Sequence, residues 1–127
     1  MSIIDKPSDY FLANLHTGNG GTQTITTGID ADWIWIKNRT SAEGSGVFDT
    51  VRGATKMLCS QNTDGESTTA NSLTAFGSAG FSVGANNRVN QNSNNIVSWN
   101  WKEQAGVFDI VSFTGNGTAR TISHSLG

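Results

Sequence analysis

The sequence predicts an all-β fold, either an antiparallel β-sandwich or a β-barrel. Short runs of aromatic and β-branched residues recur about every ten residues, and clusters of turn residues separate them. No long stretch has the 3.6-residue apolar period of an amphipathic helix. Gly, Ser, Thr and Asn supply nearly half of the chain, a composition typical of polar turns between short strands.

The first predicted strands follow a short lead. Residues 1–8 contain the only proline and are expected to be flexible. The run "DYFLANL", residues 9–15, is the first predicted strand. "TQTIT", residues 22–26, follows a glycine-rich turn and alternates as a half-exposed strand does.

The run "DWIWIK", residues 32–37, is apolar on both faces. Its tryptophans, Trp33 and Trp35, share one face. Ile34 and Ile36 share the other, because side chains alternate along a strand. Two apolar faces are typical of a strand in the interior of a sheet, so we expect this strand to lie deep in the fold.

Further strands are predicted along the rest of the chain. The expected ranges are 47–51, the second half of 52–60, 72–76, 80–84, 96–102 and 107–113. Residues 85–95, "ANNRVNQNSNN", are expected to form an asparagine-rich loop or hairpin tip. This loop offers amide oxygens but no carboxylate, so we expect turns there rather than a calcium site.

A nine-residue motif occurs twice. "TGNGGTQTI" spans residues 17–25, and "TGNGTARTI" spans residues 114–122, an offset of 97 residues that also aligns Phe11 with Phe108. Asn-Gly is the strongest short-range hairpin signal, because both residues tolerate positive φ. We therefore expect each copy to be a hairpin turn between two strands.

The second copy sets the predicted domain boundaries. We expect a β-sandwich module over residues 9–106. Residues 107–127 carry the repeated strand-turn-strand motif, and two interpretations stay open. These strands either complete the sandwich or begin a second, truncated module.

Charge and apolar patterning exclude several classes of function. The net charge is −2 and the basic residues are scattered, so the chain lacks the electrostatic footprint of a nucleic-acid partner. No apolar run approaches the roughly 20 residues of a membrane helix, and no signal peptide is visible at the N-terminus, so we expect no membrane partner. A single cysteine, Cys59, rules out an intrachain disulfide framework.

The sequence contains no recognisable catalytic or metal-binding pattern. His16 and His124 have no second metal ligand at a recognised spacing, and no nucleophile-elbow motif occurs. A glycosidase needs two carboxylates flanking a sugar, and no such pair stands out. We expect no enzyme activity, no metal and no cofactor; a glycan-degrading enzyme is the weakest alternative.

Carbohydrate binding is a more natural expectation, because aromatic platforms and amide side chains are both abundant. Trp99 and Trp101 share one face of their strand. Core packing is the usual role of strand tryptophans, so this face is either core or one broad binding surface. The candidate contact residues in turns and loops are Asn19, Asn86, Asn87, Asn90, Asn92 and Asn116.

Two basic residues flank a predicted turn. Arg52 and Lys56 lie in "VRGATK", just after a predicted strand. They are either the solvated charges of a turn or part of an intersubunit pair with Asp49 or Glu103.

Several motifs together resemble a known family. The strings "TGNG", "WIWIKNR", "FDTVRGATK", "GFSVG" and "VSWNWK" resemble a tandem β-sandwich module of bacteriophage virion structural proteins, of the tail-fibre type common in marine phages. The resemblance covers about residues 9–102, with the start of a further module at 107–127. It implies an antiparallel jelly-roll or concanavalin-like (SPRY-like) sandwich, a place in the virion and a homo-oligomer.

The expected function combines the resemblance with the residues. We expect a phage fibre, spike or appendage module that attaches to host-surface polysaccharide, located in a virion assembled in the host cytoplasm. The alternative is a capsid decoration or tail-assembly subunit whose only partners are other virion proteins. In that case residues 107–122 would complete a neighbour's sheet.

Overall fold

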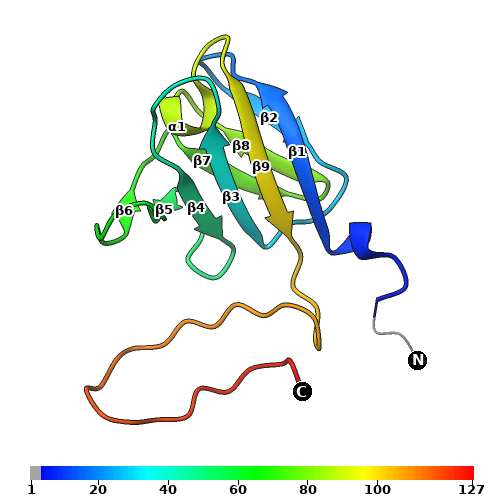
Figure 1. Cartoon of the computed structure of the whole chain (residues 1–127), viewed down its shortest axis with the longest axis vertical. Helices are drawn as coiled ribbons and strands as arrows, with labels where there is room; N and C mark the ends of the chain where they lie inside the picture. Colours follow the sequence, from blue (N-terminus) through cyan, green and yellow to red (C-terminus); the bar gives the residue numbers. More distant parts are fainter. Residues whose placement is uncertain (1–3) are drawn as a thin grey trace.

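Two antiparallel sheets face each other across an apolar core (Figure 1). The computed structural model describes residues 4–127. The strands are β1 (Phe11–Thr17), β2 (Gln23–Thr26), β3 (Trp33–Asn38), β4 (Gly46–Asp49), β5 (Lys56–Met57), β6 (Ser67–Thr68), β7 (Leu73–Gly77), β8 (Gly80–Val83) and β9 (Asn95–Trp101). Sheet A has the order β1-β9-β3-β4 and sheet B the order β2-β8-β7, while β5 and β6 form a short ribbon. The prediction of an all-β sandwich is confirmed, and the described strands close no barrel.

The core lies between the inner faces of the two sheets. Ile34, Ile36 and Phe48 from sheet A are fully buried, as are Leu73 and Val83 from sheet B. Burying a large apolar side chain contributes roughly 1.5–3 kcal/mol, so these contacts are the main stabilising interaction between the sheets. The isoleucine face of β3 therefore points inward.

The described residues also contain two short helical turns, which the sequence pattern does not predict. The first is the 3₁₀ turn η1 (Pro7–Asp9), which spans the end of the predicted lead and the first residue of the predicted strand 9–15. Residues 1–3 of the lead lie outside the described residues. The second is α1 (Asn87–Asn90), in the asparagine-rich loop. The side chain of Asn86 accepts a hydrogen bond from the Arg88 N–H and so caps α1, and Val89 is fully buried beneath it. One helical turn forms because this cap and this anchor act together.

The first glycine-rich motif is not a hairpin turn, so that prediction is wrong. β1 pairs with β9 in sheet A, and β2 pairs with β8 in sheet B. The turn between them crosses from one sheet to the other, and the N–H groups of Gly18 and Gly20 donate to the carbonyls of Asn94 and Asn90 instead. We call residues 11–29 the N-terminal arch, because they cover one edge of both sheets.

The C-terminal tail, residues 102–127, leaves the sandwich and forms no strand. Figure 1 shows it as an extended excursion that turns back on itself. The predicted strand at 107–113 is wrong; a single isolated bridge joins Gln104 and Phe108. The tail does not complete the sandwich of its own chain, because the N-terminal arch already covers the corresponding sheet edges.

His16, in the N-terminal arch, gives a testable pH dependence. Its Nε2 donates to the Val89 carbonyl at 3.1 Å, and its Nδ1 is buried without a partner among the described residues. Burial lowers the pKa of His16 below its ordinary value of 6.5. The unfolded chain therefore binds the proton more readily, and stability is expected to fall as the pH drops below about 6.5 and to level off below the folded-state pKa.

Replacing His16 by Phe is expected to remove this loss of stability on acidification. Urea unfolding between about pH 5 and pH 8 measures it. His124→Phe is the matched control, because His124 is exposed in the tail and should leave the pH profile unchanged. An unchanged profile in His16→Phe would show that another group causes the dependence.

Candidate functional site

The outer face of sheet A carries five aromatic side chains in two rows. Strand register places Phe11, Trp101 and Trp33 side by side across β1, β9 and β3. The next row places Trp99 beside Trp35. We call these five residues the tryptophan face.

The rings of the tryptophan face pack on one another rather than in the core. The ring centroids of Trp101 lie 4.6 Å from Phe11 and 4.7 Å from Trp33, and those of Trp35 and Trp99 are 5.0 Å apart. Such spacings are favourable for aromatic pairs. All four tryptophans are half-buried and Phe11 is 42% exposed. The shared face of Trp99 and Trp101 is therefore a surface, and the usual core role does not hold for these residues.

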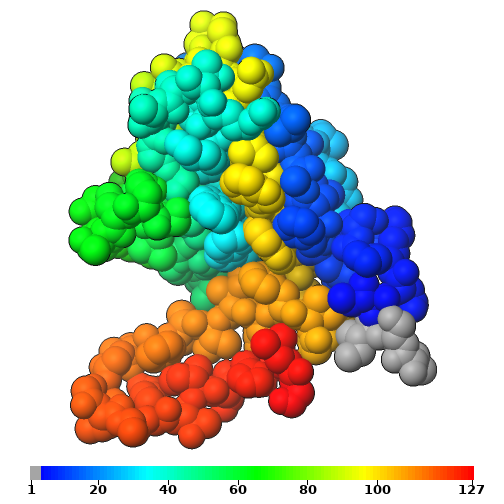
Figure 2. All heavy atoms as spheres, in the orientation of Figure 1, coloured from blue at the N-terminus to red at the C-terminus, as the bar shows by residue number. Residues whose placement is uncertain are grey.

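A hollow of about 490 Å³ lies where the tail meets this face. It is lined by Trp33 and Trp101 on the sheet and by residues 108–111 of the tail. Figure 2 shows β1, β9 and β3 side by side, with the tail crossing below them. The ring of Phe108 lies 6.4 Å from that of Trp101, so the tail forms one wall of the hollow.

Polar groups surround this end of the sheet. The Glu103 carboxylate accepts a hydrogen bond from the Ile110 N–H at 2.8 Å. The Asp109 carboxylate accepts a hydrogen bond from the Ser125 N–H, and this bond is the largest cause of the lowered pKa of Asp109. A second hollow of about 410 Å³ is lined by Asp9, Asp30, Lys102 and Gln104 among others. The tryptophan face therefore ends beside carboxylate, ammonium and amide groups that can bond to hydroxyl groups.

The structure also contains a polar atom on this face that the sequence could not reveal. The indole Nε1 of Trp35 is buried and has no hydrogen-bond partner among the described residues. An unsatisfied buried donor costs free energy.

The structure brings two of the predicted asparagines together. Asn90 is fully buried, and its Nδ2 donates to the Asn19 Oδ1 at 2.8 Å while its Oδ1 accepts from the Asn19 N–H at 3.0 Å. Its amide also bonds to the Gly21 carbonyl. Asn90 therefore has no surface to offer a ligand and fixes the N-terminal arch to α1, which corrects its prediction as a contact residue.

The remaining predicted asparagines lie on two separate parts of the molecule. Asn86 caps α1, and Asn87 and Asn92 are exposed on the same loop. Asn116 lies in the tail, where its side chain forms a local turn with Thr118. None of these four belongs to the tryptophan face, so they form no single site with it.

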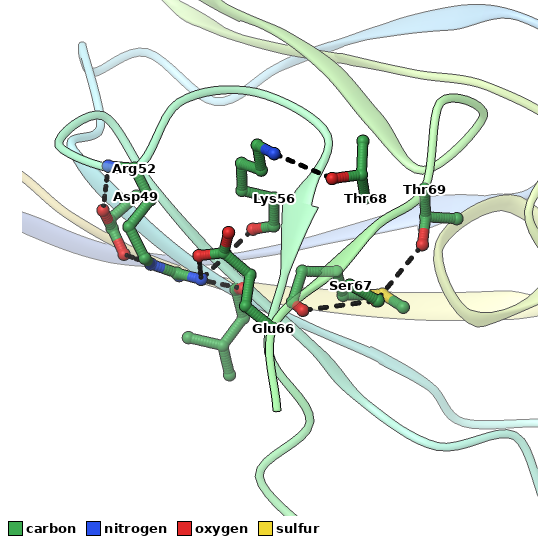
Figure 3. Close-up of polar contacts among 9 residues, drawn as sticks. Asp49, Arg52, Lys56, Glu66, Ser67, Thr68 and Thr69 are labelled. Atoms are coloured by element: carbon green, nitrogen blue, oxygen red, sulfur yellow. Dashed lines mark hydrogen bonds and ion pairs between the residues drawn. The ribbon is translucent and has the colours of Figure 1, made fainter. Parts of the chain in front are cut away.

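The basic pair after β4 has a structural role within the chain. Figure 3 shows the Arg52 guanidinium between the carboxylates of Asp49 and Glu66. Its Nη1, which contacts Glu66, also donates to the Lys56 carbonyl, and its Nη2 donates to the Val47 carbonyl. Arg52 therefore joins β4 and β5 to Glu66, the residue before β6, which replaces the interpretation of an intersubunit pair.

Within residues 4–127, no group of three His, Cys, Asp or Glu side chains lies close enough together to hold a metal ion. The same residues contain no helix with the length and apolar character needed to cross a membrane.

A family model described as "Domain of unknown function (DUF7483)" matches residues 6–127. This chain belongs to the DUF7483 family. The match includes the tryptophan face and the tail, so the second copy of the repeated motif is part of the DUF7483 domain. No curated protein and no solved structure matches the chain.

Proposed function

We propose that this protein is a bacteriophage virion module that attaches to host-surface glycans through the tryptophan face. The observation that carries the proposal is the set of five aromatic rings on the outside of sheet A. The virion location is supported by the motif resemblance alone. No catalytic step is part of the proposed function.

Side-chain chemistry supports a sugar as the ligand. The C–H groups of a pyranose ring pack on aromatic faces, while its hydroxyl groups bond to nearby polar side chains. The tryptophan face offers the first kind of contact, and the polar groups around Lys102 and Glu103 offer the second. The rings are tilted by 43–77° to their partners, so the surface is corrugated rather than flat.

The direct test is binding to intact cells of candidate bacterial hosts. The labelled chain is displayed on beads, because many copies compensate for a weak single site. Saturable binding that isolated envelope polysaccharide removes supports the proposal. An absence of binding under these conditions overturns it and favours the alternative, an assembly subunit with protein partners only.

Removing one ring of the tryptophan face is expected to weaken this binding at least tenfold. Trp101→Ala is the first variant, because Trp101 is the central ring of its row, and tryptophans at binding surfaces are frequent hot spots. Thr24→Ala is the control, since Thr24 is exposed on sheet B. Equal binding by both variants, with folding confirmed by urea unfolding, would show that the glycan binds elsewhere.

One observation favours the alternative function. Val111, Phe113 and Leu126 in the tail are 42–60% exposed, although each is large and apolar. Large apolar side chains that a chain leaves exposed are available for contacts with other proteins. An assembly role would use the tail, whereas glycan attachment would use the tryptophan face.

A further inference from the structure

We propose that the C-terminal tail is a second arch, which docks on a second copy of this chain in the position that β1 and β2 occupy. The proposal goes beyond glycan attachment, and the exchange would put Phe108 of one copy in the place of Phe11 on the tryptophan face of another. Its basis is the residue-by-residue correspondence between the tail and the N-terminal arch at the constant offset of 97 positions.

The two glycine-rich turns have the same local conformation. The Asn19 Oδ1 accepts from the Gly21 N–H at 2.9 Å, and the Asn116 Oδ1 accepts from the Thr118 N–H at 3.1 Å. The glycine after each asparagine has positive φ, +68° at Gly20 and +74° at Gly117. The turn of the tail therefore already has the conformation that the docked turn has in the N-terminal arch.

Gly115 has no reason to be glycine in its present surroundings. A Cβ at Gly115 would meet nothing within 4 Å, and Gly115 is not among the residues with positive φ. Its counterpart Gly18 has a strong reason, because a Cβ there would lie 2.1 Å from the Gln91 carbonyl oxygen. A glycine at position 115 is explained if the tail docks against the Asn90–Gln91 segment of a second copy.

The exposed apolar residues of the tail fall at the inward positions of the arch. Phe113 corresponds to His16 and Val111 to Asn14, both on the inward face of β1. Leu126 corresponds to Ile29, and Ile122 to Ile25, and both isoleucines belong to the core. Docking would bury the side chains that the tail now exposes.

At two positions the tail fits the site between β9 and β8 that β1 and β2 occupy better than the N-terminal arch does. Phe113 would replace a histidine whose Nδ1 is buried and unsatisfied, and Val111 would replace an amide. One position is less apolar, since Asp109 corresponds to Leu12. The register partner there is the buried Asn100, whose Nδ2 already donates to the carbonyls of Leu12 and Ser98 and to the Ser98 hydroxyl, so this replacement is unfavourable. The two apolar replacements, at Phe113 and Val111, favour exchange of the N-terminal arch of one copy for the tail of another.

Cysteine cross-linking of full-length chains tests the proposed register. Leu15 pairs with Val97, so its counterpart Ser112 should lie opposite Val97 of a second copy. Chains carrying Cys59→Ser with either Ser112→Cys or Val97→Cys are mixed, refolded together from urea and oxidised. Opposed strand residues satisfy the Cα separation that a disulfide needs.

The expected result is a mixed disulfide between Ser112→Cys and Val97→Cys. It should form at least tenfold more than with Lys37→Cys, because Lys37 lies one strand further across the sheet. Preferential cross-linking to Leu15→Cys would overturn the proposal in favour of addition at the free edge of β1. A disulfide that forms only when both cysteines share one chain would overturn docking on a second copy.

Gly115→Ala supplies an independent test of the same contact. In the Ser112→Cys chain it should reduce the yield of the mixed disulfide at least tenfold, because the new methyl group would meet the Gln91 carbonyl of the second copy. Gly65→Ala is the matched control, since a Cβ there meets nothing within 4 Å. Equal cross-linking by both variants would show that Gly115 does not approach the Gln91 carbonyl of a second copy, and would overturn the proposed docking.

Discussion

Gly18→Ala is expected to lower the free energy of unfolding by about 3 kcal/mol, the upper part of the usual range for overpacking. The new methyl group would lie 2.1 Å from the Gln91 carbonyl oxygen and 2.8 Å from the Asn90 carbonyl carbon. These are backbone atoms, so no side-chain rotation can relieve the clash. The segment they belong to also binds the arch through Asn90, so moving it would cost further hydrogen bonds.

Gly115→Ala is the internal control for this prediction. The same substitution in the second copy of the motif is expected to change the unfolding free energy by less than about 0.5 kcal/mol in dilute protein. Urea unfolding of both variants measures the difference. Equal destabilisation of the two would show that the tail of a single chain is packed against the sandwich.

Arg52→Ala is expected to cost about 3 kcal/mol of stability. Asp49 is 4% exposed, and the Arg52 Nε lies 2.5 Å from its carboxylate. Removing one partner of a buried ion pair typically costs about 3–5 kcal/mol, and the partial exposure of Arg52 favours the lower end. The substitution also removes the hydrogen bonds to the carbonyls of Val47 and Lys56, and Figure 3 shows the bond to Lys56.

Two variants separate the buried pair from the exposed one. Glu66→Gln is expected to cost at most about 0.5 kcal/mol, because Glu66 is 38% exposed and 3.4 Å from Arg52. Arg52→Lys keeps the charge but loses the forked geometry, so it should be clearly less stable than the wild type. The urea midpoints of Arg52→Ala, Glu66→Gln and Arg52→Lys measure the three losses of stability. A loss in Glu66→Gln equal to that in Arg52→Ala would contradict the assignment of the main contribution to Asp49.

The positions of most strands follow from the sequence by itself. β3 and β9 were predicted within one residue of their observed bounds, because alternating runs between turn residues depend on local chemistry. The local conformation of the repeated motif is also determined locally. Asn19 and Asn116 form the same turn, although one lies against the sandwich and the other in the extended tail.

Three features depend on the tertiary structure, for one physical reason. Alternation shows that Trp99 and Trp101 share a face, but either face of a doubly apolar strand can meet the second sheet, and only sheet pairing decides which. Non-local pairing likewise makes the first motif an arch, since β1 binds β9 and β2 binds β8 rather than each other. The second motif has a similar local sequence but pairs with no strand among the described residues, so it stays extended. Strand propensity is a property of the sequence, whereas a sheet requires a partner edge.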